Sequence, residues 1–141
     1  MTQFAFVPHT ADIAIRLRGA EFADLLRAGA LGIAAAATDQ ETLAPRRAPG
    51  VAPRRIVAEG APDEEGLLVT FLNELLFQGE TNGEVYTDLE VQAYSLAEGV
   101  RAEAYPDPTL TPTRSIKAAT YYDLHITRGP DGLEATVVFD V

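Results

Sequence analysis

The sequence predicts an α+β domain built as a three-layer β/α/β sandwich, in which two helices pack between mainly antiparallel sheets. The prediction combines two helical segments, about seven strand segments and the character of the helices, which are apolar around most of their circumference. Such helices need cover on more than one side. A two-layer fold would leave too much of their apolar surface exposed to water.

The size and composition of the chain agree with one domain spanning residues 1–141. A chain of 141 residues, 47% of them hydrophobic, is long enough to bury a core without disulfides. Cysteine is absent, which excludes disulfides, thiolate metal sites and a cysteine nucleophile.

The first third of the chain predicts two strands and a helix. Residues 3–7 are expected to form a short strand that stops at Pro8. Residues 12–18 alternate between apolar and polar side chains, which is typical of a strand with one buried face, and Gly19 ends it. Residues 21–37 are predicted to be a helix whose polar side chains lie only in its first two turns.

The middle of the chain predicts a loop, a strand and a second helix. A Pro-, Arg- and Ala-rich loop at residues 39–55 leads into a strand at residues 56–59. The second helix is expected at residues 63–78, because Asp63 suits its N-cap and Gly79 suits its end.

The last third predicts two hairpins. Residues 89–96 pair with 100–105, and residues 120–128 pair with 133–141 around a turn at 129–132. If Thr127 pairs with Leu133, Asp140 faces Thr120, and a shift of one residue moves its partner to Tyr121. In either register Lys117 lies just beyond the strand that neighbours Asp140.

The charge of the chain bears on its partners. Eleven basic and 21 acidic residues give a net charge of −10, which repels phosphate backbones at long range. We therefore expect no direct, tight nucleic-acid binding, and the charge suits cations or a basic protein partner better. For most of these carboxylates the simpler interpretation is that they aid solubility. Arg46, Arg47, Arg54 and Arg55 could touch RNA, but a solvated face or a partner contact is the favoured interpretation.

Several familiar signals are missing from the sequence. The N-terminus lacks a signal-peptide pattern and no apolar segment is long enough to span a bilayer, so we expect a cytoplasmic protein without a membrane partner. There is no Walker loop, no dinucleotide fingerprint, no two-histidine zinc spacing and no nucleophile elbow.

Three places could carry chemistry. One is the segment from His9 to Asp12, which puts an imidazole and a carboxylate at the start of a strand. Another is Asp140, whose side chain must lie close to the α-carboxylate of Val141. Two negative groups so close repel unless a cation or a basic side chain neutralises them. The third is Lys117. The alternatives are a turn residue for Asp12, a frayed terminus for Asp140 and an ordinary surface lysine.

Read in order, four segments resemble the archease family. They are His9-Thr10-Ala11-Asp12-Ile13-Ala14-Ile15-Arg16, Leu72-Asn73-Glu74-Leu75-Leu76, Ile116-Lys117-Ala118-Ala119-Thr120-Tyr121-Tyr122 and Val138-Phe139-Asp140-Val141. The commonest family form has a histidine where this chain has Tyr122. The family's fold is the same β/α/β sandwich.

The resemblance implies a metal site made by Asp12, Asp140 and the Val141 main chain or carboxylate, and a functional role for Lys117. His9 would be an outer-shell ligand or a hydrogen-bonded turn residue, with the turn residue favoured. Hard oxygen donors favour Ca²⁺, Mg²⁺ or Mn²⁺ over zinc.

The implied function is that of a non-enzymatic protein cofactor of the RNA-splicing ligase, the GTP-dependent enzyme that seals split tRNAs. This ligase joins a 3′-phosphate or 2′,3′-cyclic-phosphate end to a 5′-hydroxyl, and archease promotes its guanylylation and repeated turnover. The alternatives are a free-standing metal-dependent phosphoesterase and a general chaperone-like binding module.

Overall fold

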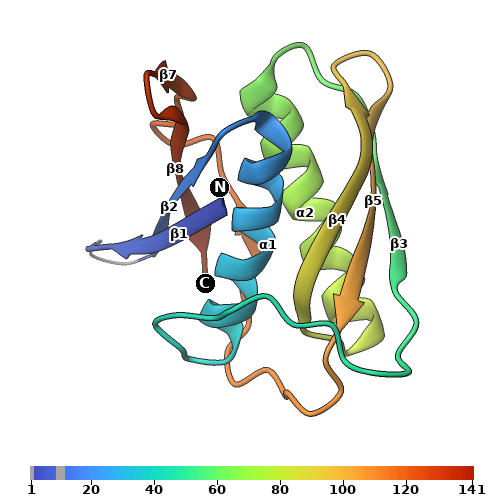
Figure 1. The fold of residues 1–141 in the computed structure, drawn as a ribbon. Helices are drawn as coiled ribbons and strands as arrows, with labels where there is room; N and C mark the ends of the chain where they lie inside the picture. Colours follow the sequence, from blue (N-terminus) through green and yellow to red (C-terminus); the bar gives the residue numbers. More distant parts are fainter. Residues whose placement is uncertain (1, 9–11) are drawn as a thin grey trace.

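The computed structural model describes residues 2–8 and 12–141, and in this part of the chain two antiparallel sheets enclose two helices (Figure 1). The five-stranded sheet has the order β1-β2-β8-β6, with β7 also paired to β8; its strands are β1 (Thr2–Val7), β2 (Ile13–Gly19), β6 (Ala118–Ala119), β7 (Thr127–Gly129) and β8 (Gly132–Asp140). The three-stranded sheet has the order β3-β5-β4, with β3 (Arg54–Ala58), β4 (Tyr86–Ser95) and β5 (Gly99–Pro106). The helices are α1 (Phe22–Ala37) and α2 (Glu64–Asn82).

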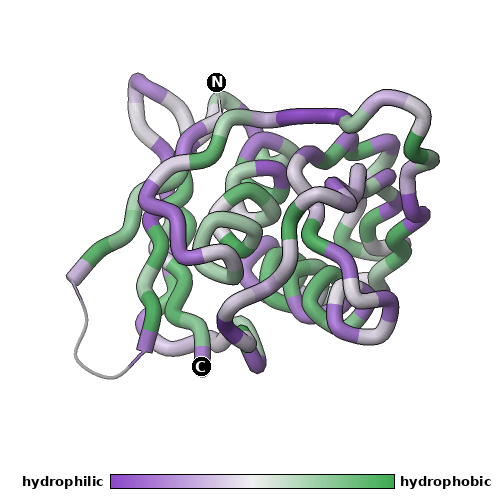
Figure 2. The backbone as a smooth tube through the Cα atoms, turned by 90° about the horizontal axis from the view of Figure 1, so that it is seen from below, coloured by the Kyte–Doolittle hydropathy of each residue, from purple (hydrophilic) through white to green (hydrophobic). Residues whose placement is uncertain are grey.

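The predicted three-layer arrangement is confirmed. Helix α1 contacts β1 and β2 of one sheet and β4 of the other, while α2 contacts β6 on one side and β3 and β5 on the other. Hydrophobic stretches of chain gather on the helices and on the strands beside them, and hydrophilic stretches lie mostly at the edges (Figure 2). No helix among residues 2–8 and 12–141 is long and apolar enough to cross a bilayer.

Small residues let the two helices of the middle layer come close together. A Cβ atom on Gly29 of α1 would lie 2.7 Å from the side chain of Leu72 on α2, so the two helices touch at this glycine. Ala28, Ala34 and Ala35 of α1 are buried around it. The run of small residues in α1, which offers no polar side chain, is therefore the central surface on which the other layers pack.

The alternating pattern of β2 faces its apolar side chains toward the helices, as predicted. In the pairing of β2 with β8, Ile15 lies opposite Val137 and Leu17 lies opposite Ala135, and all four side chains are buried. Since successive side chains of a strand point to opposite faces, the even-numbered residues of β2 and β8 lie on the outer face of the sheet.

One predicted boundary of the second helix is wrong. Asp63 is the N-cap of α2, with its carboxylate accepting from the Gly66 amide at 2.7 Å, but the helix continues past Gly79 to Asn82. It ends at Gly83, which adopts the left-handed conformation at φ 64°. Gly79 instead makes room for the returning chain, because a Cβ atom there would lie 3.2 Å from the carbonyl oxygen of Glu84.

The second predicted hairpin is also only partly correct. Residues 120–126 form an irregular excursion, in which Asp123 has φ 49° and the Leu124 amide donates to the carbonyl of Tyr121 at 3.1 Å. Arg128 pairs with Leu133 and Ala118 pairs with Asp140, so 128 − 118 = 10 positions on one strand match 140 − 133 = 7 on the other. The excursion absorbs the difference, and Asp140 faces Ala118 rather than Thr120 or Tyr121.

Arginines of the loop between α1 and β3 pair with buried aspartates. Asp88 is 4% exposed and its two oxygens accept from the Nε atoms of Arg27 at 2.9 Å and Arg47 at 2.8 Å. Arg46 donates to Asp107, which is 5% exposed, at 2.7 Å. These contacts hold the loop against the three-stranded sheet, while the Arg46 and Arg47 side chains stay 52% and 45% exposed.

The environment of Asp88 has opposing effects on its pKa. Burial alone would raise the pKa, but the hydrogen bonds from Arg27, Arg47 and the Leu89 amide outweigh burial and lower it below its ordinary value of 3.8. A carboxylate whose pKa is lower in the folded protein stabilises the fold above the pKa of the unfolded chain. This stabilisation is lost as the pH falls through the folded pKa.

We predict that Asp88→Asn lowers the free energy of unfolding at pH 7 by about 1–3 kcal/mol, because two guanidinium groups lose their acceptor while remaining partly solvated. The decline in stability as the pH falls below about 4 should also become shallower. Urea unfolding at several pH values measures both effects. Asp131→Asn, in the exposed β7–β8 turn, is the matched control, and an equal effect of both variants would contradict the prediction.

Candidate functional site

The pairing of β2 with β8 brings the start and the end of the chain together. Ile13 lies opposite Phe139, so the same register continued by one residue places Asp12 opposite Asp140. On the other side of β8, Ala118 of β6 lies opposite Asp140. Asp12 is half-buried and Asp140 is exposed. By strand alternation both lie on the outer face, where their carboxylates can be reached by solvent ions or by a partner.

Lys117 lies at the same end of the sheet. Its main-chain amide donates to the carbonyl of Asp140 at 2.8 Å, and its side chain is exposed. Val141 follows directly and is also exposed. We call this region, formed by Asp12, Lys117, Asp140 and Val141, the carboxylate end of the sheet. His9, the proposed outer-shell residue, lies outside the described residues.

The last strand is firmly held up to Asp140. Phe139 is fully buried and has strand partners on both sides, Ile13 of β2 and Ala119 of β6. Thr120 adds two bonds to the carbonyl of Val138, from its amide at 2.9 Å and from its hydroxyl at 2.8 Å. Asp140 therefore stands on an ordered strand, not on a frayed terminus.

Sequence reasoning missed one residue that supports this region. Asn73 of α2 is bonded to both main-chain polar atoms of Ala119, accepting from its amide at 2.7 Å and donating to its carbonyl at 3.2 Å. The available signal was an amide among buried leucines on the second helix, within the segment Leu72-Asn73-Glu74-Leu75-Leu76.

The donor atoms at the carboxylate end fit a hard cation. Two carboxylates and the Val141 main chain offer only oxygen, which Ca²⁺, Mg²⁺ and Mn²⁺ prefer. The described residues contain no group of three or more His, Cys, Asp or Glu side chains that could hold a metal. A site here would thus depend on main-chain or terminal oxygen and on water as well as on the two aspartates.

Comparisons with known proteins identify the family of this chain. The family model described as the Archease protein family (MTH1598/TM1083) matches residues 4–141. The chain belongs to the archease family. Protein archease of Thermococcus gammatolerans is 31% identical over 138 residues, covering 94% of this chain and 93% of the relative. Protein archease of Methanosarcina barkeri is 31% identical over 146 residues, covering 99% and 96%.

Solved structures share the archease fold. The solution structure of Methanobacterium thermoautotrophicum protein 1598 superposes with a TM-score of 0.68 at 23% identity, covering 98% of each chain. The crystal structure of an archease, possible chaperone, from Thermotoga maritima gives a TM-score of 0.63 at 20% identity, covering 96% of this chain and 94% of that one. At these identities the likeness concerns the fold.

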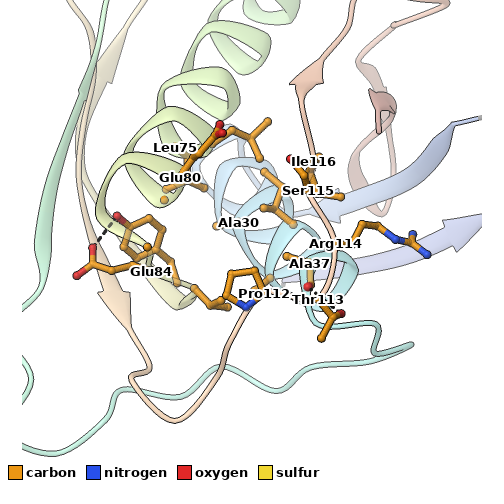
Figure 3. Close-up of a pocket in the computed structure, with 17 residues that line it drawn as sticks. Ala30, Ala37, Leu75, Glu80, Glu84, Pro112, Thr113, Arg114, Ser115 and Ile116 are labelled. Carbon is orange, nitrogen blue, oxygen red and sulfur yellow. Dashed lines mark hydrogen bonds between the residues drawn. The ribbon is translucent and has the colours of Figure 1, made fainter.

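A cavity of about 430 Å³ lies beside the carboxylate end, between the C-terminal halves of α1 and α2 and under residues 112–116 (Figure 3). Its walls are mainly apolar, and Ile116, which precedes Lys117, forms part of them. Arg114 directs its guanidinium away from the cavity (Figure 3).

At the rim of the cavity, Glu84 accepts from Tyr86 at 2.9 Å and from Arg54 at 2.7 Å. The hydrogen bond from Arg54 lowers the pKa of Glu84, and burial raises that of Tyr86.

We predict that Phe139→Ala lowers the free energy of unfolding by about 3–5 kcal/mol, because it removes a fully buried ring between two neighbouring strands. Urea denaturation followed by circular dichroism measures this. Val141→Ala, two residues on and exposed, should change stability by less than about 0.5 kcal/mol. A small effect of Phe139→Ala would contradict the packed terminal strand described above.

Proposed function

We propose that this archease-family protein is a non-enzymatic cofactor of a GTP-dependent RNA ligase that joins 3′-phosphate or 2′,3′-cyclic-phosphate ends to 5′-hydroxyl ends. It promotes guanylylation of the ligase histidine and repeated turnover, in tRNA splicing or RNA repair. Family membership supports the proposal. The single observation that supports the site is the strand register: Ile13 lies opposite Phe139 and the Lys117 amide donates to the Asp140 carbonyl, so the register continued by one residue brings Asp12 to the same end of the sheet.

The charges at the carboxylate end suit a protein partner that handles nucleotide phosphates. A net charge of −10 complements a basic opening on the ligase and speeds a correctly oriented encounter. Lys117 adds one positive group to this acidic surface, and an ammonium group there can pair with a phosphate oxygen. The exposed side chains of Lys117 and Asp140 leave both groups available to the partner.

Asp12, Asp140 and the Val141 main chain would hold one divalent cation, Ca²⁺, Mg²⁺ or Mn²⁺. When bound, the ion supplies positive charge that can offset phosphate charge during guanylyl transfer. The residues beside this proposed site are ordered: β2 begins at Ile13, directly after Asp12, β8 ends at Asp140, and the Lys117 amide donates to the carbonyl of Asp140.

A chaperone-like role is the second candidate, because the related Thermotoga maritima structure is described as a possible chaperone. Phe77 on α2 is a large apolar side chain that is 59% exposed, as a client-binding surface would need. Pulldown of a broad set of clients, in place of one ligase, would favour this role.

We predict that Asp12→Ala, Asp140→Ala and Lys117→Ala each reduce stimulation of ligase guanylylation about tenfold or more, because each removes a charged group from the proposed docking site. Transfer of radiolabelled GMP to the ligase measures this. Asp131→Ala makes the same charge change as the two aspartate variants, in the turn at the opposite end of β8, and should stimulate like the wild type.

Full stimulation by all three folded variants would reject the site. No stimulation by the wild-type protein would reject the function itself. Hydrolysis of phosphoesters by this protein alone with Mn²⁺ would favour the phosphoesterase alternative.

We also predict one cation site per chain. Calorimetric titration with Ca²⁺ or Mn²⁺ should show binding that is lost in Asp12→Asn and Asp140→Asn and kept in Asp131→Asn. A variant with two alanines added after Val141 should bind weakly if the terminal carboxylate is a ligand, and normally if the carbonyl is. Equal affinity in the two aspartate variants and the wild type would disprove the ligand set.

A further inference from the structure

Asn73 covers the edge of the shortest strand in the five-stranded sheet. Within the described residues β6 has only Ala118 and Ala119 and pairs with β8 alone. Its other side would leave the amide and the carbonyl of Ala119 without partners. The Asn73 carboxamide bonds both of them, at 2.7 Å and 3.2 Å. The side chain thus takes the place that a further strand would occupy.

The same short segment carries Lys117 at its start. On its β8 side, the Lys117 amide donates to Asp140 at 2.8 Å and the Thr120 amide donates to Val138 at 2.9 Å. On its α2 side, Asn73 holds Ala119, one of the two residues between them. The segment is therefore held from both sides over four residues, while irregular chain precedes it and the excursion at residues 120–126 follows it.

The chemistry of these contacts requires a carboxamide. One planar group must accept from an N–H and donate to a C=O of the same residue, which a carboxylate or an aliphatic side chain cannot do at neutral pH. The neighbouring Phe71, Leu72 and Leu75 are buried and fix this turn of α2 in the core. Asn73 therefore projects from a rigid part of the molecule toward a short surface segment.

We propose that Asn73 is a positioning residue that sets the place of Lys117 against Asp140. Its effect on ligase activation passes through the main chain of Ala119, and this part of the inference rests on the proposed function. The positioning itself does not, because it concerns hydrogen bonds inside this chain.

Two variants separate the bonds from packing. Asn73→Leu keeps the branching at Cγ, is a larger side chain and a better helix former, and removes both bonds. Asn73→Asp keeps the acceptor and removes the donor at neutral pH. Asn82→Ala is the matched control, because Asn82 lies on the same helix and its amide bonds the Gln78 carbonyl, 2.8 Å away, inside that helix.

The first measurement is amide hydrogen exchange by NMR. In Asn73→Leu the amides of Ala119 and Lys117 should exchange about tenfold or more faster, while the core amides of Ile15 and Val137 keep their rates. Asn73→Asp should behave similarly at pH 7 and regain protection at about pH 4, where the protonated carboxyl again offers a donor. Asn82→Ala should match the wild type.

The second measurement is ligase guanylylation at increasing concentrations of each variant. Loss of positioning should lower the maximal stimulation about fivefold or more and leave the half-saturating concentration within about twofold, since the docking groups remain. Unchanged exchange at Lys117 would overturn the proposal. Faster exchange together with full maximal stimulation would overturn the link to activation. If the wild type itself does not stimulate the ligase, the proposed function fails, and the exchange data still decide whether Asn73 positions Lys117.

Discussion

The antiparallel pairing of β2 with β8 is the interaction on which the rest of the structure depends. It joins residues near the start of the chain to residues at its end, and its inner face supplies Ile15, Leu17, Val137 and Phe139 to the core. Because side chains alternate along a strand, this register also decides which face of the sheet Asp140 lies on. The same strand pairing therefore contributes to the packing of the core and to the position of the carboxylate end.

The helix layer makes this pairing possible. Helix α1 contacts both sheets, and its glycines and alanines let α2 and the strands approach closely. Larger side chains at Gly29 would push Leu72 away, and with it the turn of α2 that carries Asn73. The distance between the two helices therefore bears on where Asn73, which bonds Ala119, stands.

The fold class was predictable because it follows from local patterns. Alternation in β2 and the apolar circumference of α1 are properties of neighbouring residues, and they require a sheet face and a buried helix respectively. The neighbourhood of Asp12, Asp140 and Lys117 came from resemblance and from hairpin register. The register was wrong at Asp140, since nothing local in residues 120–126 shows how many of them leave the strand.

The partners of the arginines and of Asn73 were out of reach for a similar reason. Arg47 and Asp88 are 41 positions apart, and Asn73 and Ala119 are 46 apart. Such pairs depend on how the layers meet, which the spacing of residues along one segment does not contain. A polar residue among leucines, like Asn73, or a carboxylate inside a strand, like Asp88, shows only that a partner is needed.

The position of β8 also has a consequence for how the protein is made. β8 lies between β2 and β6 in space but is the last strand in chain order. During synthesis, the edge of β2 that pairs with β8 and the part of α1 that contacts β8 stay uncovered until this strand leaves the ribosome. A shortened product ending before β8 would expose apolar surface to other nascent chains, which favours aggregation before the fold is complete.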